Sequence, residues 1–232
     1  MLAVAPVDRV GLLRRLMQAA QAKSADVSSQ LHPAWIHMAW QRAGIAAPTD
    51  ATAARCRAAL AGVYDLQWPT LSRFRLVAHR IALLPRTDLL RVLGAIALHL
   101  DRERVRLSIG HGLRAAIIDQ VGDVAYAGIV AACRERVGPP VGSLAVSEIE
   151  PEALAARGLA AIAAHGDWHS KRLMAWVRMA MAPALLPTAA VADRTAAADT
   201  AGALQRLSLY FPEHAWLFGS PMDRALSAST TA

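Results

Sequence analysis

Apolar residues recur at intervals of three and four along most of the chain, which is the spacing of one face of an α-helix. The first such segment begins after Asp8, a residue that can cap a helix, and its shared face carries Val10, Leu13, Met17 and Ala20. Polar residues such as Arg14 fall elsewhere on this segment. The pattern predicts an amphipathic helix whose apolar face packs on the rest of the protein.

Proline and glycine mark the ends of the next predicted helix. His32 and Pro33 begin it, because proline suits the first position of a helix, and Gly44 ends it. A third helix is predicted after Thr49 or Asp50. Its apolar face is formed by Ala53, Cys56, Leu60 and Val63.

The strongest helical pattern lies in the middle of the chain. We predict one helix between Trp68 and Pro85, and its apolar face carries Leu71, Phe74, Ala78 and Ile81. A wider apolar stripe follows and contains Leu89, Val92, Leu93, Ile96 and Leu100. A stripe of this width predicts a helix in the centre of the core.

Residues 104–109 are locally ambiguous. Val105, Leu107 and Ile109 alternate with polar residues at the period of a β-strand, whereas Asp101 and Glu103 suit the N-terminus of a helix. Helix and short strand therefore both stay open for this segment. Further helices are predicted over residues 113–121, 123–137, 151–165, 167–182 and 193–209.

The helical pattern lapses at residues 138–150, where proline, glycine and serine cluster. We interpret this stretch as a linker. The predicted organisation is an N-terminal helix and polar linker at 1–31, a helical core at 32–137, C-terminal helices at 151–210 that pack on the core, and a disordered tail at 219–232. The predicted fold class is all-α, a single irregular domain of many helices.

Composition agrees with this fold class. The 232 residues include 51 alanines and are 55% hydrophobic but 5% aromatic, and alanine is the best helix former. No run reaches the roughly 18 apolar residues that a membrane-spanning helix needs, and no signal peptide is recognisable. We therefore expect a soluble cytoplasmic protein without membrane insertion, in which Cys56 and Cys133 are small buried hydrophobes.

Two short motifs raise the question of ligand binding. Residues 110–115 read Gly-His-Gly-Leu-Arg-Ala, which matches a dinucleotide-binding turn, but the following chain is helical and lacks the second strand of that fold. We interpret this motif as a turn between helices. His165 and His169 have a zinc-ligand spacing, but Gly166 and Asp167 between them place them on different helices.

Catalytic patterns are also missing from the sequence. There is no Gly-x-Ser-x-Gly elbow, and neither cysteine has a recognisable catalytic context. Glu148, Glu150 and Glu152 follow one another in and beside the linker, where we interpret them as solvated acids. We expect no enzyme, no catalytic residues, no cofactor and no bound metal.

Charge leaves two interpretations open. The net charge is +7, carried by 23 arginines and two lysines, Lys23 and Lys171, a ratio typical of a GC-rich genome. An arginine cluster contains Arg102, Arg104, Arg106 and Arg114. It can be a solvated face or a surface that docks on an acidic protein. A nucleic-acid-binding regulator is the alternative, which we do not favour because the helices are too apolar to enter the major groove.

The middle of the chain resembles a known family. The run LLPRTDLLRVLGAIALHLDRERVRLSIG and the following GLRAAIIDQVGDVAYAGIV are similar to the SctK or YscK proteins of bacterial type III secretion, including the Hrp-cluster members of plant-associated bacteria. The matching landmarks are Leu98-His99, Ile109-Gly110 and Val121-Gly122. His32-Pro33-Ala34-Trp35 and the stretch from Gly166 to Pro183 look like further family landmarks, so the resemblance covers about two thirds of the chain.

This resemblance implies a mostly helical adaptor without catalytic residues or cofactor. It would belong to the sorting platform below the injectisome, where it would link the inner-membrane ring protein SctD to the pod protein SctQ, and thereby the stator SctL and the ATPase SctN. A partner interface is expected to use tryptophan and arginine anchors. Our candidates for partner binding are Trp35, Trp40, Arg102, Arg106 and Trp168.

Overall fold

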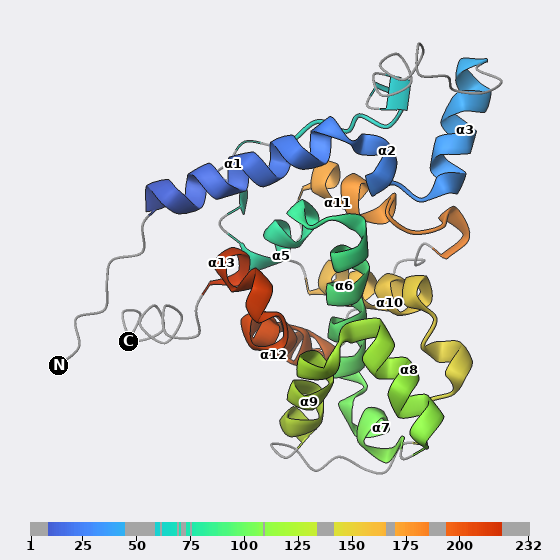
Figure 1. The fold of residues 1–232 in the computed structure, drawn as a ribbon, viewed down its shortest axis with the longest axis vertical. Coiled ribbons are helices and arrows are strands. Elements are labelled where there is room, and N and C mark those ends of the chain that lie inside the picture. Colours follow the sequence, from blue (N-terminus) through green and yellow to red (C-terminus); the bar gives the residue numbers. More distant parts are fainter. Residues whose placement is uncertain are drawn as a thin grey trace.

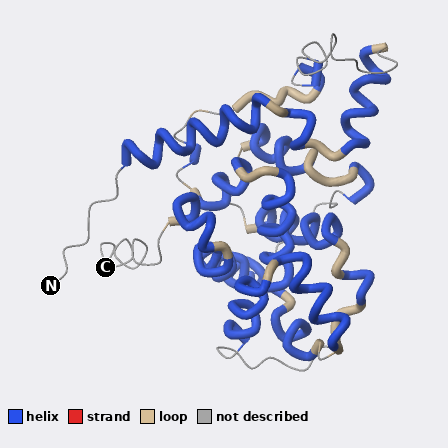
Figure 2. The backbone as a smooth tube through the Cα atoms, in the orientation of Figure 1, coloured by secondary structure: helices blue, strands red, loops and turns tan. Residues whose placement is uncertain are grey.

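The computed structural model describes residues 9–44, 59–60, 62–68, 70, 73–74, 76–108, 110–133, 142–165, 170–185 and 194–219. Within these ranges every regular element is a helix and there is no strand (Figure 2). The all-α prediction is therefore confirmed.

The helices are short and follow one another closely along the chain (Figure 1). The first half of the chain contains α1 (Arg9–Ala25), α2 (Val27–Gln30), α3 (Pro33–Ala43), α5 (Val77–Arg80), the 3₁₀ turn η3 (Ile81–Leu83), α6 (Arg86–Leu100) and α7 (Arg102–Leu107). The second half contains α8 (His111–Val121), α9 (Asp123–Ala132), η5 (Val146–Glu148), α10 (Pro151–Ala164), α11 (Lys171–Arg178), η6 (Pro183–Leu185), α12 (Arg194–Tyr210), η7 (Pro212–His214) and α13 (Ala215–Phe218).

Helix α6 forms the centre of the core, as its apolar stripe predicts. Residues 92–99 of this helix are all buried, and α8, α9, α10 and α12 all pack against it. A helix surrounded in this way needs apolar side chains on every face, and the sequence from Val92 to Leu98 supplies them.

Small residues bring α6 and α10 together. A Cβ atom at Gly158 on α10 would overlap the carbonyl oxygen of Leu93 on α6. One at Gly94 would meet Leu154 Cβ at 3.6 Å. The two backbones therefore approach to a distance that only glycine permits at position 158, which fixes α10 on the core.

Residues 102–107 form the helix α7, so the strand alternative for this segment is wrong. The period-two pattern misleads because α7 is only six residues long and its charged side chains reach ion-pair partners. Val105 points into the core, while Arg104 bonds Glu148 and Arg106 bonds Glu103. Arg104 and Arg106 of this helix thus form ion pairs, and their alternation with apolar residues does not indicate a strand.

The single helix predicted between Trp68 and Pro85 is also wrong. Leu76 is extended, and among the residues described between 68 and 80 only Val77–Arg80 is α-helical before the 3₁₀ turn η3. Side chains capture the carbonyls that a continuous helix would use: Arg80 Nε donates to Phe74 O at 2.7 Å. Phe74, Ala78 and Ile81 are nevertheless buried, as the sequence pattern predicts.

Helix α12 confirms the prediction for residues 193–209 and closes the far side of the core. Its Tyr210 hydroxyl lies 2.7 Å from His99 Nδ1 of α6. The same ring lies against Gly128 of α9, where a Cβ would come within 2.7 Å of Tyr210 Cδ1. This contact joins three helices that are distant in sequence.

Helix α1 forms, but most of its predicted inner face lies outward. Of that face, Val10, Leu13 and Met17 are exposed and Ala20 packs on the core, whereas Leu16 is buried and Leu12 also packs on the core. The prediction of this face was wrong because α1 has two apolar stripes, and the spacing alone does not say which one meets the core. The cap assigned to Asp8 lies outside the described residues.

Two other helix ends test the predicted caps. Helix α3 runs from Pro33 to Ala43, with His32 Nδ1 accepting from Ala34 N at 3.1 Å and Gly44 in the left-handed conformation at φ 65°, so this prediction is confirmed. Helix α11 begins at Lys171, and Ser170 caps it through a 3.4 Å hydrogen bond from Leu173 N. Asp167, the cap expected from the sequence, lies outside the described residues.

Parts of the predicted domain scheme are visible. Of the segment 138–150, residues 142–150 are described, and Leu144 and Ile149 are buried in the main core. The division of the chain at this segment stays a prediction, and residues 220–232 of the predicted tail lie outside the described part. No single described helix has the length and hydropathy to cross a membrane; α8 and α9 meet that test only as a pair bent by 112°.

Candidate functional site

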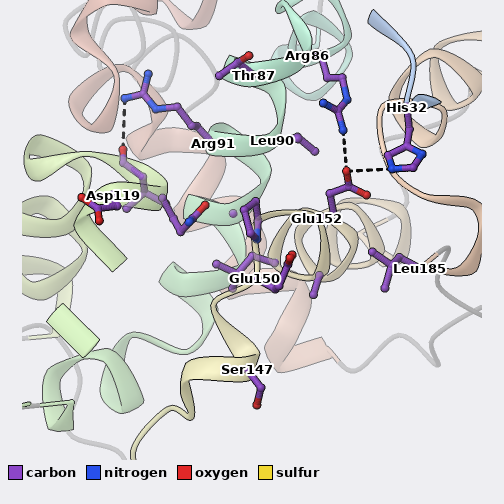
Figure 3. Close-up of a pocket in the computed structure, with 16 residues that line it drawn as sticks. His32, Arg86, Thr87, Leu90, Arg91, Asp119, Ser147, Glu150, Glu152 and Leu185 are labelled. Atoms are coloured by element: carbon purple, nitrogen blue, oxygen red, sulfur yellow. Dashed lines mark hydrogen bonds and ion pairs between the residues drawn. The ribbon is translucent and has the colours of Figure 1, made fainter. Parts of the chain in front are cut away.

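An open groove of about 840 Å³ lies beside the N-terminal turns of α6 and α10 (Figure 3). We call it the α6–α10 groove. The end of α8, the turn η5 and Leu185 complete its walls. Its lining includes Thr87, Asp119 and Ser147 along with the ionic groups described next.

Glu152 holds one end of the groove together. Its Oε1 lies 2.6 Å from Arg86 Nη2 and 3.5 Å from His32 Nε2, and its Oε2 accepts from Ala182 N at 2.8 Å. Arg86 Nε in turn donates to Ala180 O at 2.9 Å. One carboxylate thus joins the starts of α3, α6 and α10 to the chain after α11 (Figure 3).

The position of Glu152 follows from local rules. Pro151 begins α10, and a carboxylate in the first turn of a helix is stabilised by the unpaired amides there. We interpreted this acid from the sequence as solvated, which is wrong because it is partly buried and carries three contacts. The proline-glutamate pair that begins a helix is the signal that could have identified it.

Arg91 occupies the other end of the groove and is also engaged. Its Nη1 lies 3.4 Å from Asp88 Oδ1 and 3.7 Å from Glu213 Oε1. Its guanidinium lies 5.6 Å from the centre of the Phe211 ring. Nearby Gly122 has φ of +90°, and a Cβ there would meet Arg91 Nη2 at 3.0 Å. Both arginines of the groove, Arg86 and Arg91, are therefore engaged in ion pairs within the protein.

Two acids of the groove lining, Asp119 and Glu150, lack such ion pairs. Both are exposed, and neither forms an ion pair with another described residue. The groove thus combines two neutralised cations with two acids open to solvent. This chemistry suits the docking of a polar or basic protein segment.

No group of three or more histidine, cysteine, aspartate or glutamate side chains in the described part of the chain is placed to hold a metal ion. Of the zinc-spaced pair, His165 is described and His169 is not. The Gly-x-Gly-x-x-Ala motif lies at the start of α8, with Gly110 before its first residue and α7 preceding it. It is a turn between helices, as predicted.

Cys133 is a buried free thiol, as the sequence predicts for this residue. Burial and the nearby carboxylate of Glu103 raise its pKa. A thiol with a raised pKa is a weak nucleophile at neutral pH. Cys56 lies outside the described residues.

Most of the arginine cluster is engaged in hydrogen bonds and ion pairs within the protein. Arg102 is buried, donates to His99 O at 3.1 Å and pairs with Asp199 at 3.2 Å. Arg104 forms two hydrogen bonds with Glu148, of 2.9 and 2.8 Å, and these hold the pKa of that carboxyl below its usual range. Binding to nucleic acid requires cations that are free to meet phosphates, so this cluster gives little support to the nucleic-acid alternative.

The other predicted anchors differ in their surroundings. Arg106 is exposed and lies 3.2 Å from Glu103. Trp35 is partly buried and donates from Nε1 to Met181 O at 2.9 Å. The Nε1 atom of Trp40 is buried and has no hydrogen-bond acceptor among the described residues. Trp168 lies outside those residues, so the structure does not bring the five candidates into one site.

Sequence reasoning also missed Lys23. Its ammonium group is buried beneath α1 and bonds two carbonyls, Ala82 O at 2.9 Å and Leu84 O at 2.6 Å. Burial lowers its pKa to about 7. The available signal was that Lys23 is one of two lysines in a chain with 23 arginines, because a compact amine fits a space that a guanidinium does not.

Comparison with known proteins gives one decisive match. A family model described as bacterial type III secretion protein (HrpB4) matches residues 14–213. The chain belongs to the HrpB4 family. The match covers α2 to α12 completely and most of α1, so the resemblance to Hrp-type secretion proteins noted from the sequence is confirmed. Searches of curated proteins and of solved structures give no match for this HrpB4 family member.

Proposed function

We propose that this HrpB4 family protein is a non-enzymatic adaptor of the type III secretion sorting platform. In this role it links an SctD-like inner-membrane ring protein to an SctQ-like pod protein, and through the pod protein to the stator SctL and the ATPase SctN. It acts in the cytoplasm and is recruited to the cytosolic face of the inner membrane. The observation that carries the proposal is the family match over residues 14–213.

The chemistry of the α6–α10 groove supports an adaptor role. Its two arginines are used for internal ties, and its free acids Asp119 and Glu150 line an open hollow. Such a surface offers recognition groups without a nucleophile and base held in contact. A segment of a partner protein that carries Lys or Arg would complement these acids.

The first experiment removes the protein from the bacterium. We expect a clean in-frame deletion to abolish export of effector proteins and complementation in trans to restore it. We also expect the tagged protein to be recovered together with the SctD and SctQ homologues of the same gene cluster. Normal export by the deletion strain would contradict the proposal.

The second experiment tests the groove. We expect the double substitution Asp119→Arg/Glu150→Arg to weaken binding to one of the two partners, because like charges would then meet the basic partner segment. The matched control is Ala163→Arg, which adds an arginine at an exposed position of α10 outside the groove lining. Equal binding by the groove variant and the control would remove the groove from the interface.

The anchors Trp35, Trp40, Arg102, Arg106 and Trp168 remain proposed contacts of the partners. Arg106→Glu is the sharpest test among them, because Arg106 is exposed and its only ion pair with a described residue is the one with Glu103. Arg102→Glu would bury a carboxylate beside His99 O and Asp199, so it tests the fold at the same time. Unchanged recovery of both partners by Arg106→Glu would exclude that arginine as an anchor.

A further inference from the structure

The outer face of α1 exposes three apolar side chains in a row. Val10, Leu13 and Met17 have 68%, 44% and 45% of their surface exposed. Their spacing of three and four residues places them on one line along the helix, which we call the α1 stripe. Scattered exposed hydrophobes are ordinary, but a row of them on one helix is typical of a recognition surface.

The stripe cannot turn inward, because the opposite face of α1 is already engaged. Leu16 is buried in the main core, and Leu12 and Ala19 pack against it. Lys23 anchors the same face through Ala82 O and Leu84 O. Rotating α1 to bury the stripe would break these contacts, so the stripe is a surface of the folded protein. Figure 1 shows that α1 lies along the outside of the fold.

The charge around the stripe is positive and uncompensated. Arg14 and Arg15 are exposed, and neither forms an ion pair with another described residue. The sequence of α1 contains no aspartate or glutamate. Arg14 lies four residues after Val10 and three before Met17, so it flanks the apolar line directly.

We propose that the α1 stripe is the docking site for an amphipathic helix of a partner in the secretion apparatus. This helix has apolar residues spaced by three and four, with aspartate or glutamate beside them to meet Arg14. The inference rests on the proposed adaptor function and adds the surface and the chemistry of one partner. Helix-to-helix docking of this kind uses anchors at positions i, i+3 and i+7, which are the positions of the stripe.

Two other occupants fit the stripe less well. A second copy of this chain would bring the arginines of two stripes towards one another, and like charges at an interface are unfavourable. A membrane surface normally takes a helix with a broad apolar face that includes aromatic residues. The α1 stripe is one side chain wide, and α1 has no aromatic residue.

Binding of purified full-length protein to the SctD cytoplasmic domain and to the SctQ homologue tests the apolar part of the stripe. We expect Leu13→Glu/Met17→Glu to weaken binding to one of them about thirty-fold, the loss typical of a central anchor. The control is Val124→Glu/Leu209→Glu, which adds the same two charges at exposed apolar residues of α9 and α12, outside both the stripe and the groove lining. Circular dichroism and the melting temperature show that each variant is folded.

The charged part of the stripe has its own test. We expect Arg14→Glu/Arg15→Glu to weaken the same interaction about ten-fold and to reduce its dependence on salt. An acid-to-arginine reversal in the partner helix should restore binding of this variant and not of Leu13→Glu/Met17→Glu. Equal binding by the wild type and both double variants would overturn the stripe as a docking site and leave the adaptor function intact.

A photo-crosslinking residue at position 17, introduced in the living bacterium, separates the possible occupants. An adduct with an acidic amphipathic helix of a secretion-cluster protein supports the proposal. If such an adduct forms although neither purified partner binds, the result contradicts the proposed link between SctD and SctQ and not the docking site. An adduct with a second copy overturns the docking proposal. The membrane alternative is tested by sedimentation with vesicles of phosphatidylglycerol and phosphatidylethanolamine. If the wild type sediments with them and Leu13→Glu/Met17→Glu does not, while partner binding by this variant persists, the proposal is overturned as well.

Discussion

Helix α10 packs on α6 more closely than helix α1 packs on the rest of the protein. Gly158 allows α10 to reach the backbone of α6 at Leu93, and Glu152 fastens the start of α10 to its neighbours. Helix α1 touches the body along one side and leaves Val10 and Leu13 in solvent. The difference shows that close packing is concentrated around α6, whereas α1 has apolar side chains on two faces and buries only one of them.

Enlarging Gly158 should have the largest effect on this contrast. We expect Gly158→Ala to lower the free energy of unfolding by about 3 kcal/mol or more, because the added methyl group overlaps the Leu93 carbonyl and forces the helices apart. Urea denaturation followed by circular dichroism measures it. The matched control is Gly112→Ala on α8, where a Cβ meets nothing within 4 Å; equal stability of the two variants would refute the close approach.

Lys23 ties α1 to the carbonyls of Ala82 and Leu84 and should make stability depend on pH. Its pKa is about 7 in the folded protein against 10.5 ordinarily. Between these values the unfolded chain holds a proton that the folded protein lacks, so raising the pH favours folding. We expect the unfolding free energy of the wild type to gain up to about 1.4 kcal/mol per pH unit in this window relative to Lys23→Met.

Urea denaturation of both proteins at pH 6, 7.5 and 9 measures this difference. Below pH 7 the amine is charged in both states, and the folded state bears the full cost of burying that charge. A difference between wild type and Lys23→Met that stays constant from pH 6 to 9 would show that the amine is not buried as described.

Removing the Glu152 carboxylate should have a smaller effect at the groove. We expect Glu152→Gln to lower the free energy of unfolding by about 1–2 kcal/mol, since Arg86 loses its ion pair in a partly buried site. Thermal and urea denaturation provide the measurement. Glu150→Gln, two residues earlier and exposed, is the control and should change stability little; a comparable loss from both substitutions would mean that overall charge is responsible.

Substitutions on the α1 stripe should have the smallest effect on stability. We expect Leu13→Glu/Met17→Glu to change the free energy of unfolding by at most about 0.5 kcal/mol, as is usual for exposed positions. Leu16→Ala, on the opposite face of the same helix, should cost about 2 kcal/mol or more. If the double variant is the less stable of the two, the stripe faces the core and the contrast between α1 and α10 fails.

Much of the fold could be predicted from local pattern. The central helix α6 followed from a stripe that is apolar on nearly every face, and α3 followed from proline at its start and glycine at its end. The helix between Trp68 and Pro85 could not, because Arg80 takes the carbonyl of Phe74 from the backbone. A side chain that competes for a backbone carbonyl can break a helix without changing the spacing of apolar residues along the sequence.

The candidate site was less predictable than the fold. Glu152 is adjacent in sequence to acids that look alike, and only the approach of Arg86 and His32 from other helices gives it a role. Arg102 looks like a surface anchor in the sequence, yet Asp199, nearly a hundred residues later, holds it inside. Pairings between residues so far apart leave no local signal.

The sequence by itself determined that this protein is helical, which segment lies at the centre, and that it resembles the Hrp-type secretion proteins. Periodicity, caps and residue choice are local properties, and a family pattern is read along the chain. Only the tertiary structure decided which stripe of α1 faces outward and which arginines are used internally. Burial and pairing depend on what approaches from elsewhere in the chain, so Val10 and Leu16 differ in exposure although both are apolar residues of one helix.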